Sequence, residues 1–353
     1  MRVFNLLAVV IPRLLMGEVA GVMGASIQLV ERLRCAERII RETPVVELGD
    51  DRVVLFAKLE FHNGIGSIKD RPAYWILKRA VEGGKVGPET TVIESSSGNF
   101  ACALAAFCRI LGLAFIPVID PNVSPLYESM LRAQCARVVK VEERDETGGY
   151  LRTRLSMVQR LLQEIDDSYW PNQYSNPDGM DAHFQLTAAE IARAVPRLDY
   201  VFLGVSSAAT LAGVSRRIKE EHPPVKIVAV DVEGSVIFGQ KPRKRWISGI
   251  GSSICPPLLQ HAIIDDIVIV READTISGCR ELLDRHGLFV GGSTGTVYRA
   301  IQSYFCRSFT VRPRVLFLCC DRGTAYLHNV FDDAWAASRR QEEDAAITAG
   351  IHG

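Results

Sequence analysis

The sequence lacks an excess of charge of either sign. Lys plus Arg and Asp plus Glu both number 41, so the formal net charge is zero. A nucleic-acid-binding protein needs surplus basic residues to neutralise phosphates, so no nucleic-acid partner is expected. Internal repeats and low-complexity linkers are also missing. The 353 residues, 48% of them apolar, are enough for two lobes whose cores need no disulfides.

The cysteines lack the spacing of a metal site or a disulfide framework. They number nine, an odd count, and show no CxxC or Cys/His pattern. We therefore expect a protein of the reducing cytoplasm with no bound metal. The adjacent Cys319 and Cys320 lie in a strand-like run, where a free cysteine usually acts as a small apolar core residue; a redox or metal role is the alternative.

A long hydrophobic run is missing too. Pro12 and Arg13 interrupt the apolar N-terminus after about ten residues, whereas a membrane span needs about 20, so no membrane partner is expected. Residues 1–41 are predicted to form an extension, helical or frayed, or to reflect an over-long start; a targeting signal is the alternative. The catalytic body is expected to begin near Glu42, and residues 341–353 to form a C-terminal tail.

From residue 53 on, β-rich apolar runs alternate with amphipathic stretches. This pattern predicts an α/β fold of two doubly wound lobes, in which helices cover both faces of parallel sheets. The expected strands are 53–60, 91–94, 115–119, 138–142, 201–205, 227–232, 267–270 and 315–318. The expected helices are 70–83, 99–111, 125–135, 150–165, 181–194, 210–222, 275–286 and 294–305. Ligands of such sheets bind beyond the carboxyl ends of the strands, so the loops there are the candidate site.

The first of these loops carries a single lysine, Lys69, after small flexible residues and shortly before Pro72. Pro72 suits a first helical turn, so the lysine is expected at a helix N-terminus. The helix dipole and burial both favour the neutral amine, which is the form that condenses with an aldehyde. An ordinary tight turn with a surface lysine is the alternative.

Three further loops also open helices, and the first two of them directly follow expected strands. Residues 94–99 (ESSSGN) bring hydroxyls, an amide and free helix N–H groups together, and residues 205–210 (VSSAAT) offer a similar cradle for a carboxylate or phosphate. Residues 291–295 (GGSTG) are rich in glycine. For each loop the alternative is a plain capped turn, or, for the last, a strained turn that needs glycine.

The order of the motifs along the chain is more specific than any one of them. SIKDRPA, ESSSGN, NQYSNP, the small-residue helix start at 206–210, GIG at 249–251 and GGSTG follow one another. This order resembles the cysteine synthase group of fold type II pyridoxal-phosphate enzymes, which have a tryptophan synthase β-like fold. The resemblance runs from about Thr43 to about Ala336 and implies a homodimer with the cofactor in a cleft between two lobes. Residues 42–62 and 178–340 would form the larger, phosphate-binding lobe, and residues 63–177 the smaller, substrate-binding lobe.

The resemblance also implies roles for single residues. Lys69 would hold pyridoxal phosphate through its aldehyde and move protons at the substrate Cα. Asn99 would hydrogen-bond the phenolic oxygen of the cofactor, and Ser293 would lie at the pyridine nitrogen, which a hydroxyl does not force to be protonated. The cofactor phosphate would be bound by Ser206, Ser207, Ala208, Ala209 and Thr210. The substrate α-carboxylate would be bound by Ser96, Ser97, Asn99 and Gln173. Two departures from the group are the scarcity of glycine in the phosphate loop and Phe100 where threonine is common.

Residues 148–155, 165–177, 232–242 and 321–335 resemble a narrower set of these enzymes, which join O-phospho-L-serine to L-glutamate. Their product is a precursor of L-2,3-diaminopropionate for siderophores and peptide antibiotics. Phosphoserine carries a dianionic leaving group, which needs cations and donors nearby. The candidates for binding this phosphate or the glutamate carboxylates are Arg154, Tyr174 and Ser206. For Arg154 a solvated helix charge is the alternative, and the basic run of Lys241, Arg243, Lys244 and Arg245 is either a solvated loop or a lid.

The sequence therefore predicts a β-replacement enzyme that uses O-phospho-L-serine and L-glutamate. A cysteine synthase that uses O-phosphoserine or O-acetylserine with sulfide is the first alternative. A non-catalytic family member that acts as a binding partner is the second, and the presence of Lys69, Asn99 and Ser293 argues against it.

Overall fold

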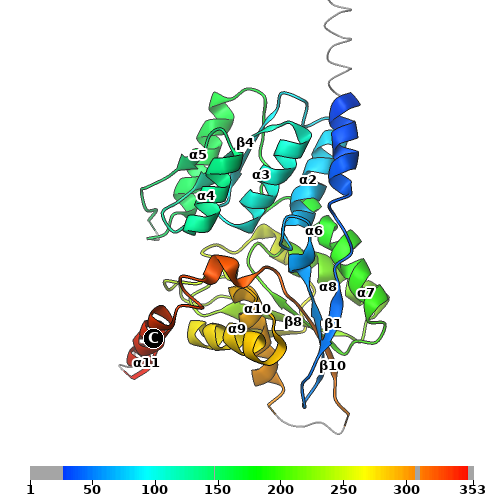
Figure 1. The fold of residues 1–353 in the computed structure, drawn as a ribbon, viewed down its shortest axis with the longest axis vertical. Coiled ribbons are helices and arrows are strands. Elements are labelled where there is room, and N and C mark those ends of the chain that lie inside the picture. The colour runs from blue at the N-terminus through cyan, green and yellow to red at the C-terminus, as the bar shows by residue number, and fades with distance from the viewer. Residues whose placement is uncertain (1–26, 147, 307–310, 349–353) are drawn as a thin grey trace, which may run out of the picture.

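The computed structural model describes residues 27–146, 148–306 and 311–348, and its strands form two sheets, one in each lobe (Figure 1). The larger sheet has six strands in the order β1 (Val45–Leu48), β2 (Val54–Lys58), β10 (Arg314–Leu318), β7 (Tyr200–Gly204), β8 (Lys226–Val232) and β9 (Asp266–Val270). The smaller has four, in the order β5 (Val139–Lys140), β4 (Ala114–Ile119), β3 (Thr91–Ser95) and β6 (Ser168–Tyr169). β1 runs antiparallel to β2, and the other paired strands are parallel, which confirms the predicted α/β class.

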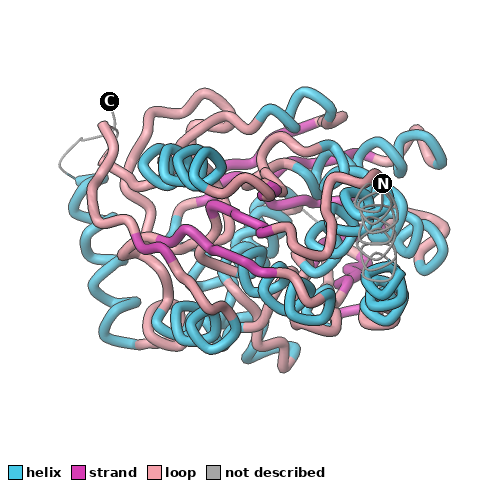
Figure 2. Tube along the Cα trace, turned by 90° about the horizontal axis from the view of Figure 1, so that it is seen from above, coloured by secondary structure: helices cyan, strands magenta, loops and turns pink. Residues whose placement is uncertain are grey.

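Helices surround the strands, as the view from above shows (Figure 2). In the smaller lobe α2 (Asp70–Glu82) and α3 (Asn99–Leu111) pack on one face of the sheet, α5 (Leu151–Glu164) packs on the other, and α4 (Pro125–Gln134) lies beside α3. In the larger lobe α7 (Ala189–Ala194) and α8 (Ala209–Glu221) cover one face, and α9 (Glu272–His286) and α10 (Gly292–Tyr304) cover the other. Successive strand residues point to opposite faces, so Val92 joins the core under α3 and Ile93 the core under α5.

Several elements differ from the sequence prediction at their ends. The helix expected from residue 181 begins earlier, as α6 (Pro177–Ala182), and continues through a π-helical segment η2 (His183–Ala188) into α7. Asn176 caps it by accepting a hydrogen bond from the Asp178 N–H (3.0 Å). Three short turns were also not predicted. They are η1 (Glu60–His62) after β2, η3 (Pro257–His261) before β9 and η4 (Gly323–Tyr326) after β10. Strands β1 and β6 and helix α11 (Asp333–Thr348) were not predicted, and the boundary placed at residue 341 falls inside α11.

The described part of the predicted N-terminal extension is helical and packs on the smaller lobe. Residues 27–37 form a helix beside α2 (Figure 1). Leu29, Leu33 and Ala36 of this helix are buried in the same apolar core as α2 and α3. Arg32 also donates to the Leu111 carbonyl at the end of α3 (3.1 Å). Residues 27–37 therefore contribute to the core of the smaller lobe. The predictions for residues 1–26 lie outside the described residues. None of the described helices is both long and apolar enough to cross a membrane.

A fully buried ion cluster anchors the start of α2. The Arg71 guanidinium donates to Glu190 (Nη1–Oε1 2.6 Å) and to Glu60 (Nε–Oε2 2.7 Å), and Lys58 Nζ lies 2.7 Å from Glu190 Oε2. Two cations thus face two carboxylates, which is the condition for burying charge without a large penalty. Burial alone would raise the pKa of Glu60, but Arg71 and Lys58 hold it below its ordinary value. The cluster fixes the backbone two residues after Lys69.

Candidate active site

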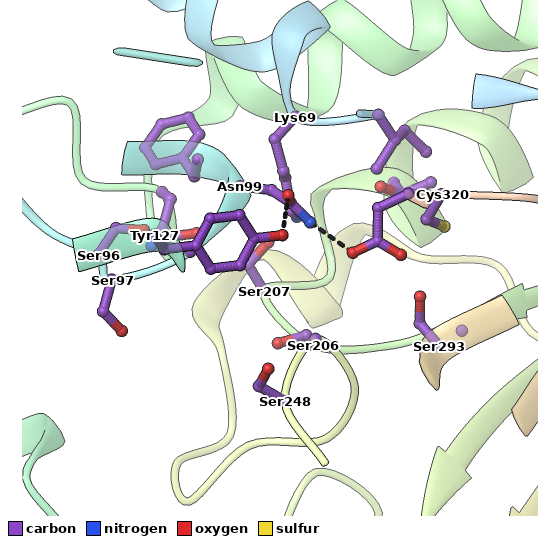
Figure 3. A pocket seen from close by; sticks show the side chains of 18 of the residues that line it. Lys69, Ser96, Ser97, Asn99, Tyr127, Ser206, Ser207, Ser248, Ser293 and Cys320 are labelled. Atoms are coloured by element: carbon purple, nitrogen blue, oxygen red, sulfur yellow. Dashed lines mark hydrogen bonds between the residues drawn. The ribbon is translucent and has the colours of Figure 1, made fainter. Parts of the chain in front are cut away.

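A cavity lies between the lobes at the carboxyl ends of the strands (Figure 3). It gathers the loops after β2, β3, β7 and β10 together with the start of α10. Its lining includes the predicted site residues Lys69, Ser96, Ser97, Asn99, Arg154, Gln173, Tyr174, Ser206, Ser207, Ala208, Thr210 and Ser293. Ala209 does not line it; this residue is buried as the first residue of α8. The structure therefore brings together side chains from six separate stretches of the sequence.

Lys69 occupies the N-cap position of α2, as the loop pattern predicts. The loop before it is folded around Asp70, whose Oδ2 accepts hydrogen bonds from the N–H groups of Ile65 (2.7 Å) and Gly66 (3.1 Å). Gly66 has φ of 121°, a conformation that favours glycine. Burial lowers the pKa of the Lys69 amine, although the nearby Cys320 and Asp321 oppose this. Lowering the pKa enlarges the neutral fraction of the amine, which is the nucleophilic form.

The loop before α8 is built to receive an anion. Ala208 has φ of 64°, a left-handed conformation that non-glycine residues rarely adopt, and it turns the chain directly into α8. The N-terminus of this 13-residue helix lies at the cavity. Free N–H groups at a helix N-terminus, together with hydroxyls, suit the binding of phosphate. Thr210 Oγ1 lies 3.1 Å from His183 Nε2. Burial and the nearby Lys69 and Arg71 keep the pKa of His183 well below its ordinary value, so its ring is neutral.

Asn99 is held from two sides by residues that the sequence analysis did not select. Its Nδ2 donates to Asp321 Oδ2 (2.6 Å), and its Oδ1 accepts from the Tyr127 hydroxyl (2.5 Å); both bonds are dashed in Figure 3. Asp321 directly follows Cys320 after the end of β10, at the carboxyl edge of the sheet where ligands of such folds bind. Tyr127 lies within α4, and nothing in its local sequence marks it as a cavity residue.

Arg154 extends from the first turn of α5 into the cavity wall. Its Nε lies 3.2 Å from Asp120 Oδ2, its Nη1 lies 3.4 Å from the Ser97 hydroxyl, and its side chain is 12% exposed. The solvated helix charge that was the alternative does not describe this residue. Tyr174 is half-buried in the same cavity lining, and removal of its hydroxyl from water raises the pKa of that hydroxyl. Gln173 donates to the Ser95 carbonyl (3.3 Å), which ties its loop to the end of β3.

The two adjacent cysteines have different surroundings. Cys319 lies in the core of the larger lobe, as predicted, whereas Cys320 lines the cavity near Ser293 (Figure 3). Cys320 is partly buried and also packs against the apolar core under α8, so the predicted core contacts hold for it as well. The surroundings differ because the two residues point to opposite sides at the carboxyl edge of the sheet. Burial raises the pKa of Cys320 to about 12, so its thiol stays protonated.

The basic run at 241–245 stays outside the cavity lining in the described structure. Arg243 lies 3.2 Å from Glu233, and Lys244 packs 3.4 Å from the centre of the Trp246 ring. Arg245 donates to the Ile250 carbonyl (3.2 Å) and to Ser253 (3.1 Å). These contacts describe a loop on the surface of the larger lobe rather than a lid over the cavity.

Comparison with known proteins gives the class of this molecule. Residues 36–321 match the model of the pyridoxal-phosphate dependent enzyme family, so the chain belongs to that family. It is 45% identical over 320 residues to N-(2-amino-2-carboxyethyl)-L-glutamate synthase of Ralstonia nicotianae, covering 88% of this chain and 94% of that protein. The synthase of the same name from Cupriavidus metallidurans is 43% identical over 305 residues, or 84% of this chain and 89% of the relative.

Solved structures agree with this class. The O-acetylserine dependent cystathionine beta-synthase of Helicobacter pylori has a TM-score of 0.78 at 29% identity, covering 83% of this chain and 97% of that one. A hydrogen sulfide-producing enzyme of Fusobacterium nucleatum has a TM-score of 0.77 at 26% identity, covering 83% of this chain and 99% of that one. The predicted fold type II architecture is therefore confirmed.

The residues of the cavity fit pyridoxal phosphate, the cofactor of the family. A half-buried lysine with a lowered pKa suits the aldehyde, and the start of α8 suits the phosphate. Asn99 Nδ2 donates one hydrogen to Asp321 Oδ2, and its second hydrogen is left for a group bound in the cavity, such as the phenolic oxygen of the cofactor.

Proposed function

We propose that this protein joins O-phospho-L-serine to L-glutamate, giving N-(2-amino-2-carboxyethyl)-L-glutamate and phosphate. The two curated relatives that bear this name are 43–45% identical over most of the chain, which supports the assignment. The structural observation that carries it is the cation Arg154 in the cavity wall beside Ser97. A substrate with a dianionic leaving group needs such a cation, and uncharged donors of the same cavity would not replace its charge.

We propose that the following residues hold the four parts of the cofactor. Lys69 holds its aldehyde carbon, Asn99 its phenolic oxygen, Ser293 its pyridine nitrogen, and the loop 206–210 its phosphate. Residues 42–62 and 178–340 supply the phosphate-binding lobe, and residues 63–177 the substrate-binding lobe. Pyridoxal phosphate, when bound, acts as an electron sink that makes the substrate Cα–H acidic.

The residues of this chain perform the remaining steps. Lys69 Nζ takes the Cα proton of phosphoserine and later returns a proton to the same carbon. Ser96, Ser97, Asn99 and Gln173 bind the α-carboxylate, and Arg154, Tyr174 and Ser206 bind the anionic groups of phosphoserine and glutamate. Burial of the cavity between the lobes holds the glutamate amine close to the substrate Cβ and excludes water.

The experiment that tests this function follows products from O-phospho-L-serine by mass spectrometry, with L-glutamate, L-glutamine or sulfide as acceptor. We expect the glutamate adduct to form quickly, the glutamine adduct poorly and cysteine slowly, because a site built to pair a carboxylate rejects an acceptor without one. Faster cysteine formation at matched acceptor concentrations would instead identify a cysteine synthase. Formation of no product with any acceptor, in protein that carries the cofactor, would support the non-catalytic alternative.

We further propose a cytoplasmic homodimer whose product supplies L-2,3-diaminopropionate for siderophore or peptide-antibiotic synthesis. All nine cysteines lie in the described part of the chain and none is in a disulfide, which supports a reducing compartment. The dimer rests on the resemblance to cysteine synthases. Light scattering of the purified holoenzyme tests it, and a monomer mass would refute it.

A further inference from the structure

Asp321 is a fully buried carboxylate whose surroundings hold it in one orientation. Its Oδ2 accepts from Asn99 Nδ2 (2.6 Å) and from the Tyr326 hydroxyl (3.2 Å). The Gly291 N–H donates to the Asp321 carbonyl (3.1 Å), and a Cβ added at Gly291 would lie only 2.1 Å from Asp321 Oδ1. The turn before α10 therefore packs directly against the carboxylate, which has no room to turn away from Asn99.

The two partners of Asn99 determine which way its amide faces. An ionised carboxylate can only accept hydrogen bonds, so the group that meets Asp321 must be the NH2 of Asn99. The Tyr127 hydroxyl then donates to the Asn99 oxygen from the other side (2.5 Å). One hydrogen of the NH2 group is used by Asp321, and the second is left for a ligand of the cavity. With a neutral residue at position 321 the amide could be reversed, and its oxygen would then face where the donor is needed.

The ionised form is the one expected at neutral pH. Burial raises the pKa of Asp321 to about 6, while the hydrogen bonds from Asn99 and Tyr326 and the charge of Lys69 oppose the rise. The carboxylate is therefore mostly charged above pH 7. Its second oxygen, Oδ1, remains without a hydrogen-bond partner among the described residues and adds negative charge to the same side of the cavity.

We propose that Asp321 is a positioning residue that fixes the Asn99 amide as a hydrogen-bond donor to the phenolic oxygen of pyridoxal phosphate, with Tyr127 as the opposing clamp. The proposal rests on the role proposed above for Asn99 but not on the identity of the amino-acid substrates. An uncharged residue of the same size at position 321 would no longer hold the Asn99 amide in one orientation. Part of the hydrogen-bond donation by Asn99 would then be lost, although the packing volume at position 321 is unchanged.

The test is a double-mutant cycle on the holoenzyme with Asp321→Asn and Asn99→Ala. The readouts are the dissociation constant of pyridoxal phosphate and the ratio of the visible to the near-ultraviolet absorbance of the loaded protein, which reports where the proton shared with the phenolic oxygen lies. No amino acid is added, so the result is independent of the acceptor experiment. Asp333→Asn serves as the matched control, because its side chain is 92% exposed on α11.

We expect each single variant to weaken cofactor binding about three- to tenfold, the worth of one hydrogen bond, and to lower the visible share of the absorbance. The double variant should be no weaker than Asn99→Ala alone, because Asp321 acts through Asn99. Wild-type values for Asp321→Asn, or losses that multiply in the double variant, would overturn the proposal. If Asp321→Asn does not fold, Tyr127→Phe replaces it in the same cycle. The double variant Tyr127→Phe with Asn99→Ala should then bind the cofactor no more weakly than Asn99→Ala alone. A cofactor affinity and absorbance that Tyr127→Phe leaves unchanged would overturn the proposal.

Discussion

Arg154 and Asp120 form an ion pair across the smaller lobe, with Arg154 Nε 3.2 Å from Asp120 Oδ2. Asp120 follows β4, and its Oδ1 also accepts from the Asn122 N–H (2.8 Å), so the carboxylate is itself held in place. The pair leaves the far end of the guanidinium near Ser97, where a ligand in the cavity can reach it. Arg154 is thus held in position before substrate binds.

Arg154→Ala should therefore reduce kcat/KM for O-phospho-L-serine about ten- to a hundredfold, since a hydrogen bond to a charged group is worth roughly 1.5 to 3 kcal/mol. The loss should be smaller for O-acetylserine, whose leaving group carries less charge. Steady-state kinetics with both substrates check this. Arg160→Ala is the matched control, because Arg160 lies on the same helix with its side chain 69% exposed. Equal losses for both substrates would mean that Arg154 does not bind the phosphate.

Lys69→Ala should abolish turnover and remove the visible absorbance of the bound cofactor, because it removes the buried amine of the cavity lining. Lys78→Ala is the control, since Lys78 lies on the same helix and pairs with Glu82 near the surface. The two variants are compared by absorbance and product formation. A Lys69→Ala protein that keeps both the wild-type spectrum and the activity would contradict the site.

Leu33→Ala should lower the free energy of unfolding by about 2 to 5 kcal/mol, because it leaves a cavity in the core shared with α2 and α3. Val30→Ala on the same helix is the control, since Val30 is exposed. Urea unfolding of the full chain measures both. Equal midpoints for the two variants would mean that Leu33 does not contribute to the stability of the smaller lobe.

Asp321→Asn should stabilise the cofactor-free protein, and more so at higher pH. The pKa of Asp321 is raised from 3.8 to about 6, so the charged form is disfavoured by folding. The contribution of the carboxyl to stability is complete below its unfolded pKa and is lost as the pH rises through about 6. The variant should therefore gain about 3 kcal/mol at pH 8 and about half of that at pH 5. Thermal unfolding at both pH values checks this, and a gain that shrinks between pH 5 and pH 8 would contradict it.

Much of the cavity could be predicted because its chemistry comes from loops directly after strands. The loops with Lys69, Asn99 and Ser206 are far apart in sequence, yet the carboxyl ends of the parallel strands β2, β3 and β7 bring them to one cavity. Ser293 follows helix α9 rather than a strand, so this rule does not place it. Asp321 carries the same signal, since it follows the strand expected at 315–318, and could have been found in this way. Leu29, Leu33 and Ala36 recur at helical spacing, which also predicts a buried helix face.

Other features depend on tertiary packing that no local pattern encodes. Tyr127 reaches Asn99 because α4 packs beside α3, and a tyrosine within a helix gives no sign of this. The ion pair of Arg154 with Asp120 joins α5 to the end of β4 and is equally invisible in the sequence. The position of the 241–245 run depends on contacts that reach beyond the run, from Arg243 to Glu233 and from Arg245 to Ser253.

The pairing of β2 with β10 joins opposite ends of the chain, whereas β3 to β6 come from one continuous stretch between them. The chain leaves the ribosome from its N-terminus onwards, so the smaller sheet can form before β10 has been synthesised. Until then β2 has an unpaired edge, and closing so long a loop is a slow step in folding. Lys69 and Asn99 are thus present early in synthesis, but Ser293 and Asp321 arrive late. The cofactor can be enclosed only when nearly all of the chain has left the ribosome.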